Sequence, residues 1–230
     1  MGVYGSFEEA LRAAPQTAPV GYNHASAASL YEDMVNRVQA KDYPALYWLR
    51  RTLDRASTVF DFGGNVGISY YAYQKYLAGC GPSHWTVCDV PAVINAGSRR
   101  AVEQGATALQ FTSSFSDASG CDVLFTAGTL QYIESPFDAL VETLFRRPAH
   151  IVVNMMPTLP DRTVITLQNI GISYCAYRII ERGALAPALQ RLGYVLEDEW
   201  INPETRTRMP YADDMPGITW IGQYYRLAVS

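Results

Sequence analysis

The 230-residue sequence has few of the residues that metal, redox or nucleic-acid chemistry would require. Its four cysteines form no CxxC pair, and none of its three histidines lies beside them at metal-ligand spacing, so we expect no metal site. The net charge of −4 provides no basic field for a phosphate backbone, which disfavours nucleic acid as a partner. We expect the cysteines to be reduced thiols, as in a cytoplasmic protein.

Long hydrophobic segments are also absent. Residues 1–20 include acidic side chains and no continuous apolar stretch, which is not the pattern of a signal peptide. No apolar run approaches the roughly 20 residues that span a bilayer, so we expect no membrane partner. The 49% apolar content is sufficient for the core of one domain.

What the chain does contain is an alternation of short apolar runs and amphipathic segments. Because the runs are too apolar to be half exposed, they predict a parallel sheet covered by helices on both faces. The expected strands are 58–62, 85–89, 109–111, 122–126 and 151–154, and the expected helices are 68–77, 91–103, 136–145 and 179–192.

Two further expected strands, 194–200 and 218–227, have no helix between them. They predict an antiparallel hairpin at the sheet edge, joined by a loop over 202–216. The predicted fold is therefore α/β, a doubly wound, mostly parallel seven-stranded sheet that ends in an antiparallel hairpin.

Ahead of the first strand, residues 1–56 are expected to form an N-terminal helical lid on the domain formed by 57–230. Ser26 or Ser29 is a suitable helix cap, and Leu30, Met34, Val38 and Leu46 supply an apolar face. A break at Asp42-Tyr43-Pro44 divides this region into two helices. We expect the lid and the domain to form one structural unit.

A glycine-rich turn follows the first strand. Gly63, Gly64 and Gly67 allow close approach of a ligand to the backbone, and Asn65 tolerates a left-handed conformation. Asp61 precedes the turn by two residues, where its carboxylate would repel a diphosphate but attract a ligand that carries an ammonium and a sulfonium group. The turn therefore favours an aminoacyl-sulfonium ligand over a dinucleotide.

A second acidic residue, Asp89, ends the next expected strand. A carboxylate at this position can accept hydrogen bonds from both ribose hydroxyls, and Val90 beside it is suited to packing on an adenine. The alternative is that Asp89 caps the helix that begins at Pro91.

At this point the sequence resembles the class I S-adenosylmethionine-dependent methyltransferases. Residues 61–67 are similar to their first motif, with Asn65 in place of the usual third glycine, and residues 122–133 are similar to their fourth-strand motif. Within that superfamily, residues 63–67, 88–91 and 127–132 resemble a group of methyltransferases often associated with surface-polysaccharide clusters. The resemblance covers roughly residues 55–228.

The resemblance implies S-adenosyl-L-methionine as cofactor. Asp61 would hold a water or the methionine amine, Asp89 would hold the ribose, and Gln131 and Tyr132 would border the methyl group. Core packing is the alternative for Phe115 and Tyr132. The implied cofactor residues are Asp61, Gly63, Gly64, Asn65, Gly67, Asp89, Val90, Ser114, Phe115, Ala127, Gly128 and Gln131.

The residues expected to act on the acceptor are less clearly marked. His84 and His150 precede strands, and ligands bind at the opposite, carboxyl ends. His24 is therefore the histidine we select as a general base, with an exposed or capping role as the alternative, and Tyr132 is the second candidate. The acceptor walls would come from the N-terminal helices, residues 156–178, which include Tyr174 and Tyr177, and the loop that carries Arg206 and Arg208.

The predicted function is methylation of a hydroxyl or carboxylate on a small molecule or sugar. This acceptor is also the expected partner of the protein. The sequence leaves open whether the chain forms a homodimer. Alternatives are N-methylation of a small amine and a non-catalytic cofactor-binding partner subunit. A nicotinamide-dependent oxidoreductase would use a similar turn, but Asp61 and the terminal hairpin argue against it.

Overall fold

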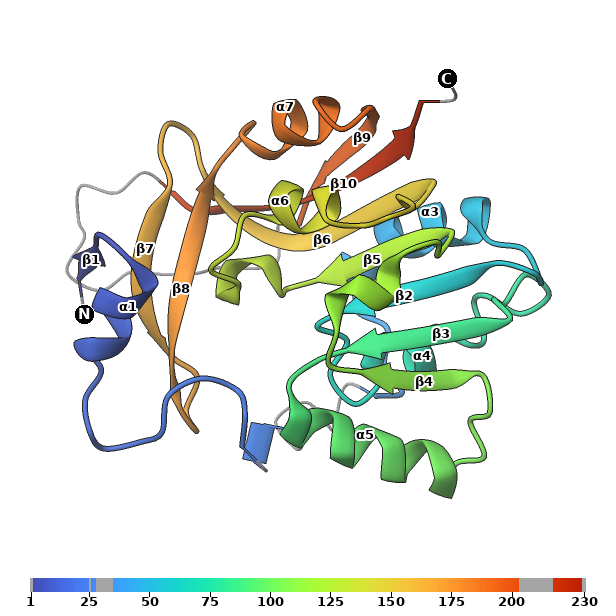
Figure 1. Cartoon of the computed structure of the whole chain (residues 1–230), viewed down its shortest axis with the longest axis horizontal. Coiled ribbons are helices and arrows are strands. Elements are labelled where there is room, and N and C mark those ends of the chain that lie inside the picture. The colour runs from blue at the N-terminus through green and yellow to red at the C-terminus, as the bar shows by residue number, and fades with distance from the viewer. Residues whose placement is uncertain (1, 25, 28–34, 203–216, 229–230) are drawn as a thin grey trace.

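The computed structural model describes residues 2–24, 26–27, 35–202 and 217–228 (Figure 1). Ten strands form one mixed sheet in the order β1-β7-β8-β6-β5-β2-β3-β4, and β10 pairs with both β6 and β9. The strands are β1 (Val3–Tyr4), β2 (Thr58–Phe62), β3 (His84–Cys88), β4 (Leu109–Thr112), β5 (Val123–Ala127), β6 (His150–Leu159), β7 (Val164–Asn169), β8 (Tyr174–Glu181), β9 (Tyr194–Ile201) and β10 (Thr219–Leu227).

Helices cover both faces of the central strands. One buried cluster joins Leu49 and Ala72 to Phe125, and the other joins Phe137 and Leu189 to Leu124. No helix in the described ranges is long and apolar enough to cross a bilayer. The helices are α1 (Phe7–Arg12), α3 (Tyr43–Thr52), α4 (Ile68–Tyr73), α5 (Pro91–Glu103), α6 (Phe137–Glu142) and α7 (Leu185–Gln190), with short 3-10 turns η2 (Ala40–Asp42), η3 (Phe115–Ala118) and η4 (Leu130–Tyr132).

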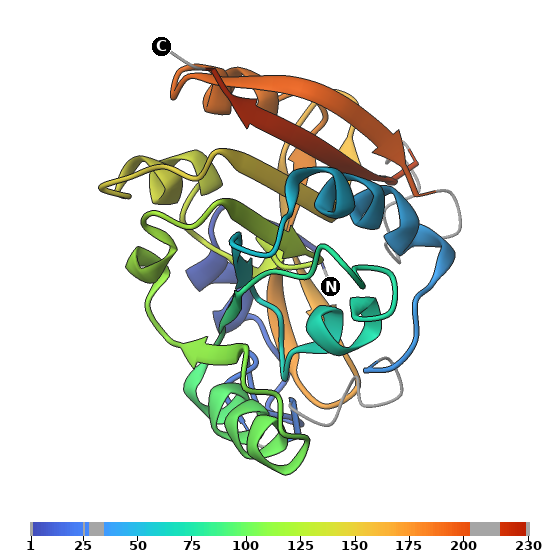
Figure 2. The same cartoon turned by 90° about the vertical axis from the view of Figure 1, so that its right-hand side faces the viewer.

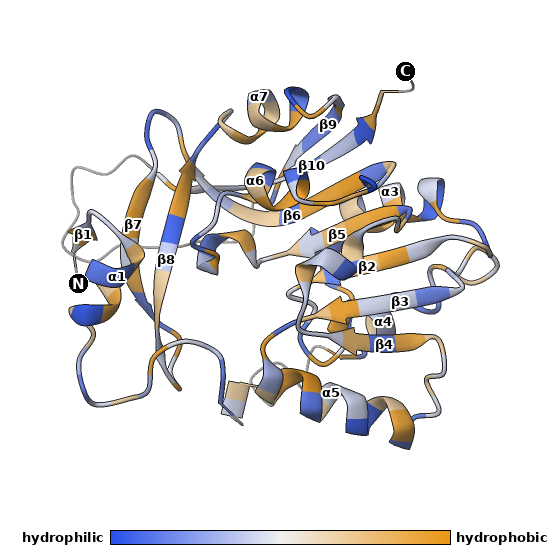
Figure 3. Cartoon of the chain, in the orientation of Figure 1, coloured by the Kyte–Doolittle hydropathy of each residue, from blue (hydrophilic) through white to orange (hydrophobic). Residues whose placement is uncertain are grey.

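The central sheet confirms the predicted fold class. Strands β4, β3, β2, β5 and β6 run parallel, and β10 and β9 follow as an antiparallel pair. Figure 3 shows apolar residues along β5 and β6 and an alternation of apolar and polar residues along α5, as expected for strands covered on both faces and for a helix with one solvated face. Figure 2 shows the β9–β10 hairpin at one end of the molecule and α5 at the other.

The sheet has three strands that the sequence analysis missed, so the predicted count of seven strands was wrong. β7 and β8 form an antiparallel pair, and β1 adds to β7. The predicted helix over 179–192 was wrong in its first part, because the β-branched Ile179 and Ile180 continue β8. Gly183, at φ +94°, turns the chain, and only Leu185–Gln190 is helical.

Other boundaries also differ from the prediction. The predicted helix over 68–77 ends at Tyr73, that over 136–145 spans only Phe137–Glu142, and β6 continues to Leu159. α3 begins at Tyr43 with Pro44 in its first turn, but the 3-10 turn η2 leads directly into it, and Val38 lies in an irregular segment, so the described residues show no break between two helices at Asp42. Ser29, Leu30 and Met34 lie outside the described residues.

β6 changes partners midway along its length. β5 ends where Ala127 pairs with Asn154, and farther along β6 the last two residues, Thr158 and Leu159, pair with β8. The register with β10 shifts between Met156 and Val153, and Met155 has φ +57°, so β6 contains a β-bulge at the place where β5 leaves it. The bulge separates the central sheet from the β8-β7-β1 arm.

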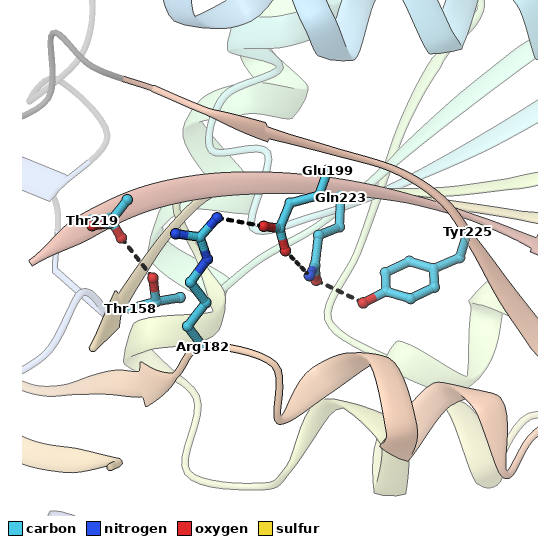
Figure 4. A network of polar contacts seen from close by, with 6 residues as sticks. All are labelled: Thr158, Arg182, Glu199, Thr219, Gln223 and Tyr225. Atoms are coloured by element: carbon cyan, nitrogen blue, oxygen red, sulfur yellow. Dashed lines mark hydrogen bonds and ion pairs between the residues drawn. The ribbon is translucent and has the colours of Figure 1, made fainter. Parts of the chain in front are cut away.

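A polar network attaches the hairpin to the segment that follows β8 (Figure 4). Arg182 donates to Glu199 at 2.7 Å, and Gln223 donates to the other oxygen of Glu199 at 2.8 Å. Tyr225 donates to Gln223 at 2.6 Å, and this buried pair has its polar atoms satisfied. The network therefore fixes β9 and β10 relative to the start of α7.

Candidate active site

A cavity of about 460 Å³ lies where β2, β3 and β5 end. The residues that follow these strands form one wall, as expected for a ligand site at the carboxyl edge of an open α/β sheet. The remaining walls come from α1, residues 21–22 and 37–42, α4, η4, the β6 bulge, β8 and β10. Its volume is within the range of small-molecule sites.

The glycine turn after β2 is tightly packed against its neighbours. At Gly63, with φ +77°, a Cβ atom would lie 2.1 Å from Thr129 Oγ1, and at Gly64 it would lie 2.4 Å from Asp61 Oδ2. Asn65 adopts φ +54°, the conformation expected for it from the sequence. Only glycine fits the first two positions, so the turn keeps its backbone close to the cavity.

Asp61 is the most deeply buried ionisable group of the cavity wall, with 1% of its surface exposed. Its Oδ2 accepts a hydrogen bond from Trp85 Nε1 at 3.1 Å. Burial, with a smaller contribution from the nearby Asp89, raises the pKa of Asp61 to about 7 against the opposing effect of the Trp85 hydrogen bond. A cation in the cavity would stabilise the ionised form of this carboxylate.

Asp89 holds the glycine turn from the adjacent strand end. Its Oδ2 accepts from the backbone N–H of Asn65 at 2.9 Å, and its Oδ1 accepts from Val90 N–H at 2.8 Å. The N-cap residue of α5 is Val90, and no side chain caps that end, so the alternative helix-cap role of Asp89 was wrong. Burial raises the pKa of Asp89.

The segment after β5 supplies a buried amide to the cavity. Gln131 is 2% exposed, and its Oε1 has no hydrogen-bond partner among the described residues. Gly128, at φ +70°, precedes it and donates its N–H to Asn154 O at 2.9 Å. A buried acceptor without a donor is costly, which indicates that a ligand donor completes this site.

Tyr132 lines the same cavity next to Gln131. Its hydroxyl donates to Gln168 Oε1 on β7 at 2.7 Å, and its ring packs edge-on against Tyr22 and Tyr177. The Tyr132 ring is therefore a fixed part of the cavity wall. It contacts the buried Tyr177 and also faces the cavity.

The segment before α3 and the end of α4 contribute polar residues that the sequence analysis did not select. Asp42 and Tyr73 line the cavity and interact with each other, and burial raises the pKa of both. Asn154 Nδ2 donates to Lys41 O at 3.0 Å and holds this segment over the strand ends. The predicted break before Pro44 was the only signal in the sequence, and it gave no reason to place Asp42 beside β2.

The structure brings most of the predicted site residues to the cavity and leaves four outside its lining. Gly67 is the N-cap residue of α4 at φ +89°, and the exposed Ser114 bonds to Ser116. Phe115 packs against Phe60 and Phe62, in line with the core alternative. The predicted residues that do line the cavity are Asp61, Gly63, Gly64, Asn65, Asp89, Val90, Ala127, Gly128, Gln131 and Tyr132.

His24 is the fourth residue outside the cavity lining. Its Nε2 lies 3.1 Å from Gly21 O, and its Nδ1 lies 2.9 Å from Ser26 Oγ. Both ring nitrogens thus have partners within the same turn, and its role as a base stays a prediction. His84 and His150 are the first residues of β3 and β6, at the ends remote from the cavity, as expected.

The predicted acceptor walls are partly in place. Tyr174 points its hydroxyl toward Thr17, 3.4 Å away, and its neighbours Cys175 and Ala176 line the cavity instead. Arg206 and Arg208 lie outside the described residues. Phe7, Leu11 and Trp220 are cavity residues that no sequence motif marked.

No family model and no curated protein matches the sequence. Solved structures do match: the cyclase SpnF aligns with a TM-score of 0.58 and 13% identity over 93% of this chain and 98% of its own. The N-terminal domain of EvdMO1, in the presence of SAH and D-fucose, aligns with a TM-score of 0.56 and 14% identity over 89% of this chain and 95% of its own. Magnesium protoporphyrin IX methyltransferase from Synechocystis PCC 6803, with bound SAH, aligns with a TM-score of 0.55 and 13% identity over 90% of this chain and 96% of its own.

The chain has the fold of class I S-adenosylmethionine-dependent methyltransferases. At these identities the similarity shows the fold alone, and the finer resemblance to the polysaccharide-cluster group has no support from sequence comparison. One similar protein is a cyclase, so the fold by itself does not determine the reaction.

The cavity residues fit S-adenosyl-L-methionine. Within the part of the chain that the structure describes, Gln131 Oε1 has no donor, which an ammonium or hydroxyl group would supply, and Asp61 accepts a hydrogen bond from Trp85 Nε1 and forms no ion pair. Glycine at position 64 lets the backbone of the turn pass directly against the Asp61 carboxylate.

Proposed function

We propose that this chain is an S-adenosyl-L-methionine-dependent methyltransferase that acts on a hydroxyl or carboxylate of a small molecule. The observation that carries the proposal is Asp61, a carboxylate buried under a glycine turn at the edge of a cavity, with one neutral donor as its partner. A cationic ligand satisfies this arrangement, whereas a diphosphate would be repelled by both Asp61 and Asp89.

Each residue then has a defined role. Under this proposal Asp61 and Gln131 Oε1 bind the amino-acid end of the cofactor, and Asp89 accepts hydrogen bonds from the ribose hydroxyls. The cofactor supplies a methyl group that is already activated by its sulfonium. Met155, Trp220 and Tyr22 exclude water from the part of the cavity where the acceptor would lie.

The acceptor oxygen is positioned rather than strongly deprotonated. Among the described residues that line the cavity there is no histidine. The Tyr132 hydroxyl donates a hydrogen bond to Gln168, and its ring lines the cavity beside the region proposed for the acceptor. Alignment in a dry cavity contributes much of the rate enhancement for such an in-line displacement, and an acidic acceptor needs little further help.

Two other functions are tested by the same assays. N-methylation of a small amine would use the same cofactor site and yield a methylated amine. A cyclase or a non-catalytic cofactor-binding subunit would bind the cofactor without transferring its methyl group, and the similarity to a cyclase gives this alternative a structural basis.

The first experiment is calorimetric titration of the purified protein with S-adenosylhomocysteine, with NAD as a parallel ligand. We expect saturable binding of S-adenosylhomocysteine alone, followed by transfer of a labelled methyl group from S-adenosylmethionine to a member of a hydroxyl and carboxylate library. Binding of NAD alone would contradict the cofactor assignment. Binding without methyl transfer to any library member would favour the non-methylating alternatives.

A further inference from the structure

Part of the cavity lining comes from large side chains and has a different chemical character from the strand ends. It includes Phe7 of α1, Tyr22, the ring of Tyr132, Met155 of the β6 bulge and Trp220 of β10. These side chains present aromatic faces and edges and a thioether, while Gln39, Lys41 and Asp42 add polar groups from the segment before α3. The carboxylates Asp61 and Asp89 and the amide of Gln131 lie on the strand-end wall.

The aromatic side chains are held in fixed positions. Tyr22 and Tyr132 meet edge-to-face with ring centroids 5.1 Å apart at 74°, and Tyr132 and Tyr177 meet at 5.3 Å and 75°. Backbone bonds between Gly21 N and Tyr174 O and between Tyr174 N and Pro19 O, both under 3 Å, attach the segment that carries Tyr22 to β8. A rigid set of rings is complementary to another flat ring rather than to a flexible chain.

Met155 adds an independent indication. It has φ +57°, a conformation that glycine adopts without cost, yet the position carries a methionine that is 9% exposed and lines the cavity. Its Cβ lies 3.8 Å from the position that a Cβ would occupy at Gly128, next to the predicted reaction region. Thioethers make favourable contacts with aromatic rings, so the bulge places a soft surface where a ring would lie.

We infer that the acceptor is a planar aromatic compound that carries the methylated hydroxyl or carboxylate, rather than a sugar. The inference rests on the proposed function. An aromatic ring would bury its faces against these rings and leave only its one reacting group to be oriented, whereas a sugar would require a hydrogen-bond partner for each of several hydroxyls. In the transfer, the acceptor oxygen forms a bond to the methyl carbon as the carbon–sulfur bond breaks, the bonding pair remains on sulfur, and a phenol releases its proton to water.

The test measures binding to protein saturated with S-adenosylhomocysteine, by ligand-observed NMR. The probes are phenol, 4-hydroxybenzoate, 2-naphthol and 4-hydroxycinnamate, each with its ring-saturated analogue, and D-fucose. We expect at least one aromatic probe to bind about fivefold or more tightly than its saturated analogue, and D-fucose to bind more weakly than both. Equal affinity within every pair, or tighter binding of D-fucose, would overturn the inference.

A matched pair of variants tests whether the preference for aromatic probes arises in this cavity. Tyr22→Leu removes a ring from the cavity wall and should reduce the aromatic preference about fivefold. Tyr174→Leu makes the same change on β8, outside the cavity lining, and should leave the preference unaltered. Equal losses in both variants would show that the preference does not arise in this cavity.

S-adenosylhomocysteine titration separates this inference from the proposed function. Cofactor binding together with no aromatic preference would overturn the aromatic acceptor alone. If the protein does not bind S-adenosylhomocysteine, the aromatic probes are titrated into the free protein. An aromatic preference there would support the cavity assignment while the methyltransferase proposal fails.

Discussion

The two walls of the cavity are built in opposite ways. The cofactor wall consists of backbone turns that follow β2, β3 and β5, and its side chains are short and fixed by neighbouring strands. The acceptor wall consists of large side chains from five separate elements, from Phe7 in α1 to Trp220 in β10. Under the proposed function, the strand ends of the sheet would bind the cofactor, and the elements added to the sheet would select the acceptor.

The difference between the walls should be largest in their tolerance of a single methyl group. Gly63 and Gly21 both have positive φ, +77° and +78°, but a Cβ at Gly63 would meet Thr129 Oγ1 at 2.1 Å whereas one at Gly21 has nothing within 4 Å. We expect Gly63→Ala to lower the free energy of unfolding by about 3–4 kcal/mol and Gly21→Ala by about 1 kcal/mol. Urea denaturation measures both, and equal losses would show that backbone conformation alone accounts for the effect.

The charge of the cofactor wall is the next feature to test. Asp61→Asn keeps the shape and can keep the Trp85 hydrogen bond, but it removes the negative charge. We expect S-adenosylhomocysteine affinity to fall about 30-fold, roughly 2 kcal/mol, with the fold intact. Asp161→Asn, on an exposed loop, serves as the control and should change nothing. Unaltered affinity in Asp61→Asn would remove Asp61 from the cofactor site.

The same residue predicts a pH dependence. Because the pKa of Asp61 is raised from 3.8 to about 7, the folded protein holds this proton more tightly than the unfolded chain does. The contribution of Asp61 to stability is therefore present at low pH and decreases as pH rises from about 4 to about 7. Cofactor affinity should change in the other direction, rising about tenfold from pH 6 to pH 8, and this rise should be absent in Asp61→Asn.

We expect a substitution by glycine to lower the free energy of unfolding less at Met155, on the acceptor wall, than at its neighbour Met156 in the core. Met155→Gly relieves the left-handed strain as it removes a buried side chain, so the net loss should be within about 1 kcal/mol. Met156→Gly, next to it in regular strand and in the core, should lose about 3–5 kcal/mol. Similar losses in thermal or urea unfolding would contradict the view that Met155 is kept for the cavity.

The smallest expected effect concerns His24. Because both of its nitrogens bond within the Gly21–Ser26 turn, His24→Asn should lower stability by about 1 kcal/mol and change kcat less than threefold. A hundredfold drop in kcat, with loss of the acidic limb of its pH profile, would instead establish His24 as the general base.

These contrasts also explain what the sequence could and could not predict. Asp61, Gly63, Gly64 and Asp89 were found because a strand, a turn and an acid lie close together in the chain, and their geometry is local. Trp220 and Phe7 were missed because nothing local distinguishes a cavity aromatic from a core aromatic; only the tertiary fold brings them together.

The missed strands have a related cause. In β8, Ile179 and Ile180 lie between Arg178 and Glu181, a pattern that fits the first turn of a helix as well as the end of a strand. Pairing with β7 and with the extended end of β6 decides between the two, and this contact depends on the bulge at Met155. Tertiary context therefore overrode the local pattern at the end of β8.

The position of β10 has a consequence for how the molecule folds. It is later in the chain than every other strand of the sheet, yet it lies between β6 and β9, so β9 joins the sheet only through it. Until β10 inserts, one side of the long, apolar β6 is an open edge able to pair with a strand from another molecule. We therefore expect completion of this edge to be a slow, aggregation-sensitive step, with exchange of the β9–β10 hairpin between copies as its characteristic misfolding route.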